Sequence, residues 1–191
     1  MPTRAEIQDT LAASQTEVVS FFQGLSPEDL ERPATANGVP GAAPWRAKDH
    51  LAHLVQNERS IQRLLRRILA GEPPDVILLS QYPEGMPLPG TLGDLNALTP
   101  EEEERLELAI ANINQAYLNA HHDDSLELLV TDFLEARQDT IDLLLQFSDE
   151  QLAGTVPSVV GEATASDIFA GRAGHASEHI TEIKEGWRQR V

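Results

Sequence analysis

Cysteine is absent from the 191-residue chain, so no disulfide can form and no protein thiolate can act as a nucleophile or a metal ligand. Any thiol chemistry would need a thiol supplied from outside, and a reducing cytoplasm is the compartment we expect. Lysine is also scarce: only Lys48 and Lys184 occur, and the formal net charge is −17. Because a protein that binds phosphates needs a basic face, this balance argues against nucleic acid or an anionic membrane as partner.

Long apolar runs are missing as well. The longest, at residues 76–79, spans about four residues, whereas a helix that crosses a bilayer needs roughly 20. The beginning of the chain shows no basic patch followed by an apolar stretch, so no targeting segment is expected. Alternation of apolar and polar residues never persists, and residues 76–79 are the only strand candidate.

Apolar residues at three- and four-residue steps predict four long helices, at about 3–23, 46–70, 125–147 and 164–188. Thr3 and Glu6 have the spacing of a capping box. Residues 25–30 and 147–152 carry the same short-helix signature in each half of the chain, and each signature is followed by a loop, at 31–44 and around 154–161. The pattern therefore predicts an all-α four-helix bundle formed by residues 1–191 as a single domain.

A long connection, residues 72–124, joins the second and third long helices. Its first half is rich in proline and glycine, and a helix from about Thr99 to Leu118 is expected in its second half. The segment holds eleven acidic residues against one basic residue, Arg105. We interpret it as an acidic crossover that lets the second and third long helices run parallel.

Histidine is the residue type with the most chemical information. His175 and His179 are four residues apart, so they lie on one face of the last helix and can share a cation. Because a catalytic zinc-type site has three protein ligands and an open position, a third ligand is needed, and the second helix offers His53 or His50. The residue pattern does not decide between these two. His121 and His122 lie in a polar joint and are expected to be solvated.

Other readings of the same residues remain open. The histidine pair can be incidental, and residues 175–179 also fit the His-x-x-Glu-His pattern of inverted zinc peptidases, whose folds are far larger. Arg172 and Asn57 are weak candidates for substrate binding, although Arg172 can instead pair with Asp132 or Glu135. Glu178 and Glu182 are either acceptors that orient the histidines or exposed helix charges. No residue is assigned a catalytic role.

Two segments carry a family resemblance. Residues 45–54 read Trp-Arg-Ala-Lys-Asp-His-Leu-Ala-His-Leu, and residues 174–180 read Gly-His-Ala-Ser-Glu-His-Ile. Their order and spacing, with the long link between them, resemble the DinB-like superfamily. The resemblance implies a four-helix bundle, often a homodimer, that binds a divalent metal, commonly zinc or nickel, through His53, His175 and His179. Arg46 differs from the family pattern, in which a Ser or Thr cap is common.

The resemblance also implies an activity class. Characterised members of this superfamily include enzymes that use mycothiol or bacillithiol, such as maleylpyruvate isomerases and S-transferases. The leading hypothesis is therefore a metal-dependent transferase or hydrolase that acts on a small electrophile with an external low-molecular-weight thiol or with water. The alternatives are a non-enzymatic bundle that binds a metal or a small-molecule ligand, and a dimeric scaffold.

Overall fold

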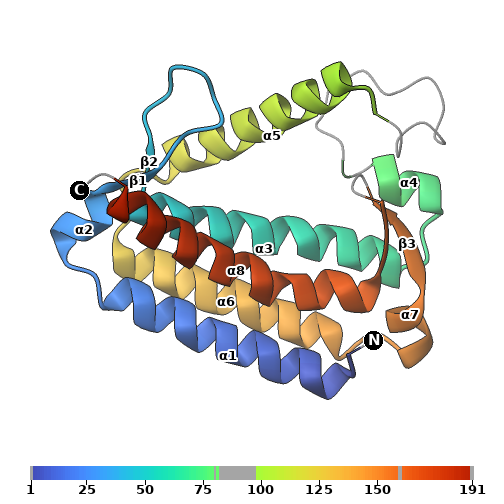
Figure 1. The fold of residues 1–191 in the computed structure, drawn as a ribbon. Helices are drawn as coiled ribbons and strands as arrows, with labels where there is room; N and C mark the ends of the chain where they lie inside the picture. The colour runs from blue at the N-terminus through green and yellow to red at the C-terminus, as the bar shows by residue number, and fades with distance from the viewer. Residues whose placement is uncertain (1, 80, 82–97, 159–160, 190–191) are drawn as a thin grey trace.

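The computed structural model describes residues 2–79, 81, 98–158 and 161–189. Four long helices form a bundle (Figure 1): α1 (Arg4–Gln23), α3 (Ala47–Leu69), α6 (Leu126–Leu144) and α8 (Ala165–Arg188). The helices α3 and α6 run parallel and pack against each other, while α1 and α8 run in the opposite direction. The predicted all-α bundle and its parallel pair of helices are confirmed.

Side-chain caps explain where these helices begin. Thr3 Oγ1 accepts the N–H of Glu6 at the start of α1, and the Glu6 carboxylate accepts the N–H of Thr3. At the start of α3, Arg46 has no oxygen that could accept such a bond. Asp49 still supplies the second bond of a capping box, because its Oδ2 atom accepts the backbone N–H of Arg46 at 2.7 Å. The Asp49 carboxylate also binds the Arg46 guanidinium at 2.6 Å.

Each half of the chain contains a short helix followed by a two-stranded antiparallel sheet. The short helices are α2 (Pro27–Glu31) and α7 (Asp149–Ala153), each capped by a serine as predicted. The strands β1 (Pro33–Thr35) and β2 (Trp45–Arg46) pair after α2, and β3 (Thr155–Ser158) and β4 (Gly161–Thr164) pair after α7. The expectation of loops without strands was wrong at these points, because strands of two to four residues are too short to produce a visible alternation.

The crossover contains two helices in its described parts. Residues 76–79 are helical, within α4 (Pro74–Leu79), so the strand suggested there was wrong. The helix α5 (Pro100–Ala120) carries the chain back along the bundle, which is why α3 and α6 can run parallel. Most of the proline- and glycine-rich stretch falls outside the described residues. Whether residues 1–191 are one domain stays a prediction.

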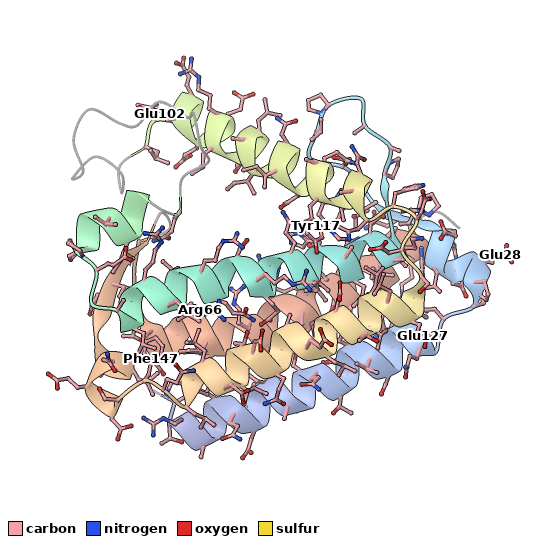
Figure 2. The ribbon with its side chains drawn as sticks, turned by 180° about the vertical axis from the view of Figure 1, so that it is seen from behind. Glu28, Arg66, Glu102, Tyr117, Glu127 and Phe147 are labelled. Atoms are coloured by element: carbon pink, nitrogen blue, oxygen red, sulfur yellow. The ribbon has the colours of Figure 1, made fainter. Side chains whose placement is uncertain are left out.

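The helix α5 approaches the bundle at one end only. In both views its C-terminal end lies close to the start of α3, while its N-terminal end stands away from it (Figures 1 and 2). Tyr117, labelled in Figure 2, packs against the core, and its ring stacks on His121 with a centroid distance of 4.1 Å. The segment after β1 and the last turns of α8 lie at this same end of the molecule.

The bundle core consists of two apolar clusters separated by a polar layer. One cluster includes Phe22, Leu51 and Phe133, and the other includes Leu11, Leu65 and Phe169. Between them, every long helix contributes a polar side chain. The fully or partly buried residues of this layer are Ser14, Glu58, Gln62, Arg137, Thr140 and Arg172.

Candidate metal centre

The antiparallel packing of α3 and α8 brings three histidines together. The ring centroids of His53 and His175 are 5.5 Å apart, those of His53 and His179 are 4.9 Å apart, and those of His175 and His179 are 4.5 Å apart. One ring nitrogen from each residue lies within 4.8 Å of those from the other two. His53 and His179 are buried, and His175 is partly buried. The three residues expected to cluster from sequence are therefore neighbours in the fold.

Each of these histidines has a buried ring nitrogen with no hydrogen bond of good geometry among the described residues, although Gln56 lies close enough to His53 to oppose the lowering of its pKa by burial. The atoms are His53 Nδ1, His175 Nε2 and His179 Nε2. Leaving a buried polar atom unpaired costs about 1–3 kcal/mol, so three such atoms in one place are an unusual arrangement for a bundle interior. A cation that accepts three nitrogen lone pairs would satisfy all three, and the donor set fits a divalent transition metal.

A hydrogen-bond chain behind His179 defines which of its nitrogens is free. Glu182 Oε2 lies 2.8 Å from His179 Nδ1, and a carboxylate oxygen can only accept, so Nδ1 carries the proton. His50 Nδ1 lies 3.0 Å from the same atom and accepts from it as well. His50 Nε2 then carries a proton and donates to Thr35 Oγ1 at 3.0 Å. His179 Nε2 is left as the nitrogen with a free lone pair, and it is buried without a hydrogen-bond partner in the described part of the chain.

Burial keeps these imidazoles neutral. It is the largest cause that lowers the pKa of His50 to about 3, of His53 to about 4 and of His175 to about 3, and the nearby His179 ring lowers each of them further. Burial also lowers the pKa of His179, while Glu182 opposes that shift. Neutral imidazole is the form that binds a metal, so the site needs no deprotonation near pH 7.

An open cavity of about 770 Å³ borders the histidines on one side. It lies between the segment 34–38, α5 and the last turns of α8, and both His50 and His179 line it. The Trp45 ring covers the cluster at the same end, with centroid distances of 5.3 Å to His50 and 5.2 Å to His53. A small molecule in this cavity would lie next to His179.

The two weak candidates for substrate binding contact each other. The Arg172 guanidinium donates to Asn57 Oδ1, one turn below the histidines on α8 and α3. Burial lowers the pKa of Arg172. Asp132 and Glu135, the alternative partners, form no ion pair with Arg172 in the described part of the chain. Asp132 Oδ1 lies 3.6 Å from Arg59 Nη2 instead. Its positive charge therefore stays close to the histidine cluster.

Sequence reasoning missed an ion pair within the polar layer of the core. Arg137 Nη2 lies 2.8 Å from Glu58 Oε1, and both side chains are almost fully buried. Thr140 donates to the second Glu58 oxygen at 2.6 Å. A signal existed, because Arg137 lies four residues from Phe133 and from Ile141 and so falls on the buried face of its helix.

The histidines of the crossover and one of the two acids considered with the trio make no hydrogen bond to it among the described residues. His122 is exposed, as expected, whereas His121 is partly buried and bonds to Asp124 at 2.7 Å. Glu178 is an exposed helix charge. The residue pattern alone left His50 as a competitor of His53, and the family resemblance favoured His53. His50 forms a second three-residue group with His179 and Glu182.

Fold and site together define a class: an all-α helical bundle with a buried histidine cluster contributed by two antiparallel helices. None of the described helices is long and apolar enough to cross a membrane. The family model described as the DinB superfamily matches residues 1–60, so this part of the chain is similar to that superfamily. The match contains His50 and His53 but ends before α8. No curated protein and no solved structure matches the chain significantly.

Proposed function

We propose that His53, His175 and His179 bind one divalent metal ion, zinc or nickel, and that the protein is a metal-dependent transferase or hydrolase. The observation that carries this proposal is a cluster of three imidazole rings with ring nitrogens within 4.8 Å of one another, in which each ring also has a buried nitrogen without a hydrogen-bond partner among the described residues. Three imidazoles leave a coordination position open, which supplies either an activated water for hydrolysis or a bound external thiol for transfer to a small electrophile.

The surroundings favour an open site over a closed structural one. No fourth described His, Asp or Glu joins the group formed by the three histidines. The cavity beside His179 offers room for a small substrate. A non-enzymatic metal-binding bundle would need neither feature. Arg172 is held by Asn57 one turn from His175, where it can orient a negatively charged part of a substrate.

The first test is metal content. Protein purified without an affinity tag should hold about one metal ion per chain by elemental analysis, after incubation with zinc or nickel if needed. His53→Ala, His175→Ala and His179→Ala should each lose it. His122→Ala is the matched control, because His122 is exposed and lies outside the cluster.

A further variant separates the two histidine groups. His50→Ala removes a ligand only from the group of His50, His179 and Glu182, while His53→Ala removes one only from the proposed site. Retention of the ion in His50→Ala with loss in His53→Ala supports the proposal. Loss in His50→Ala with retention in His53→Ala, or no metal in the parent protein, refutes it.

Catalysis is tested next on the loaded protein. Turnover of small electrophiles with an added thiol, or of small esters and amides with water, should depend on the metal and disappear in His53→Ala. A protein that holds the ion but turns over neither substrate class would favour the alternative of a metal or ligand carrier. A homodimer and a cytoplasmic location, both expected from the sequence, stay predictions.

A further inference from the structure

Among the described residues, the cavity beside His179 is lined by three glutamates and by no lysine or arginine. Glu107 comes from α5, and Glu182 and Glu185 come from α8. Glu182 is occupied by its bond to His179. Glu107 and Glu185 are exposed at the rim, and neither is paired with a basic side chain within residues 2–79, 81, 98–158 and 161–189. Two carboxylates thus face one opening without a counter-charge.

The wall of the cavity is apolar and aromatic. Ile110 lines it from α5, and its side chain is 42% exposed. An exposed aliphatic side chain beside a cavity can pack against an alkyl group of a bound molecule. Trp45 lines it from β2, and its indole Nε1 atom is buried without a partner among the described residues. An aromatic face beside carboxylates is an arrangement that recognises organic cations.

The deep end of the cavity differs from its rim. His179 is 8% exposed, and its Nε2 atom has no partner within the described part of the chain. A molecule that filled the cavity would therefore meet the carboxylates of Glu107 and Glu185, the side chains of Ile110 and Trp45, and the imidazole ring of His179. Carboxylate-bearing molecules would be repelled, because the exposed Glu107 and Glu185 carboxylates line the cavity without a basic partner in the described part of the chain.

We propose that this cavity binds a small organic cation, an amine or quaternary ammonium on a short alkyl chain, with its charge between Glu107 and Glu185 and its other end toward His179. This proposal names a substrate class for the proposed function. It rests on that function only for the reaction, which would take place at the end of the bound molecule near His179. Binding of the cation itself needs the rim and the wall, so it persists without a metal ion.

The experiment uses the tryptophan inside the cavity as a reporter. The chain has two tryptophans, and Trp187→Phe leaves Trp45 as the only fluorophore of this kind. The probes are n-hexylammonium, hexanoate and hexanol, which share one chain length and differ in charge. Titration of Trp45 fluorescence should give saturable binding of hexylammonium at least tenfold tighter than that of hexanoate. Its affinity should fall between 20 and 200 mM NaCl, because salt screens exposed charges.

A charge-matched pair of variants makes the test specific. The double variant Glu107→Gln/Glu185→Gln should weaken hexylammonium binding about tenfold or more. The control Glu103→Gln/Glu127→Gln removes two exposed charges that do not line the cavity and should leave binding unchanged. Equal losses in both pairs would mean that only the net charge of −17 attracts the cation, and that outcome overturns the proposal.

Two further outcomes also overturn it: hexanoate binding as tightly as hexylammonium, and no saturable response to hexylammonium at all. Repeating the titration in His53→Ala separates this proposal from the metal site. Cation binding that survives in a variant without metal supports the rim site even if the proposed metal chemistry fails. Metal binding without cation binding leaves the proposed function standing and removes this substrate class.

Discussion

His179 Nδ1 lies 2.8 Å from Glu182 Oε2, one turn further along α8. Because a carboxylate oxygen can only accept, this contact places the only proton of a neutral His179 ring on Nδ1 and leaves Nε2 as the nitrogen that can bind a metal ion. The residue that orients the proposed ligand is therefore encoded three positions after it, on the same helix face.

Removing Glu182 should weaken metal binding without abolishing it. Glu182→Ala frees the His179 ring and its tautomer, and loss of such an orienting partner typically costs 10–100-fold in metal affinity. Competition with a metal chelator measures the change. Glu178→Ala is the control, because Glu178 is an exposed acid on the same helix with no hydrogen bond to the ring in the described part of the chain. Similar losses in both variants would point to general electrostatics instead of orientation.

The buried pair of Glu58 and Arg137 should be costly to break from one side. Glu58→Gln leaves the Arg137 guanidinium buried beside a neutral partner, and we expect the free energy of unfolding to fall by about 3–5 kcal/mol. Urea denaturation measures it. Arg59→Ala, which breaks a partly exposed pair with Asp132 at 3.6 Å, should cost less than about 1 kcal/mol. Equal effects of the two variants would contradict the assigned importance of burial.

Gly186 is required by the close approach of α8 to β1. A Cβ atom at this position would lie 1.8 Å from the backbone oxygen of Ala34, so Gly186→Ala must displace β1, at a cost of about 1–3 kcal/mol or more. Gly174→Ala, on the same helix with nothing within 4 Å, should stabilise the protein by up to about 1 kcal/mol. Thermal unfolding of the two variants checks this contrast, and a stabilising Gly186→Ala would show that the contact is absent in solution.

The stability of the metal-free protein should fall as the pH is lowered from 7.5 to 5.5. Burial lowers the pKa of His53 to about 4 and of His175 to about 3 in the folded state, while an unfolded histidine keeps a pKa of about 6.5. Below pH 6.5 the unfolded chain therefore binds protons that the folded chain does not, and each such histidine should remove roughly 1.3 kcal/mol by pH 5.5.

Urea unfolding in the presence of a chelator measures this dependence, and pH 5.5 stays above the isoelectric point of about 4.6. The variant His53→Gln should show a shallower fall than the parent, because one of the depressed groups is gone. His122→Gln, which changes an exposed ring, should follow the parent. Identical slopes for the parent and His53→Gln would show that His53 is not held neutral by burial.

Local signals made much of the fold predictable. Thr3, Ser26, Thr99 and Ser148 each cap a helix where the sequence placed one, because a hydroxyl that accepts a backbone N–H three residues ahead is a short-range interaction. The two small sheets escaped prediction for the opposite reason. β1 and β2 are separated by the nine residues 36–44, and a strand of three residues carries no pattern that predicts a partner at that distance.

The sequence by itself determined the helices, their apolar faces and the four-residue spacing that puts His175 and His179 on one side of α8, since these follow from helix geometry alone. The residue pattern narrowed the third histidine of the cluster to α3, and only the family resemblance favoured His53 over His50. Only the tertiary structure decided that His53 faces the pair while His50 turns to Thr35 and the far side of His179, because that depends on how two antiparallel helices pack. It alone brought Glu107 of the crossover to the same cavity as Glu185, residues that no local pattern connects.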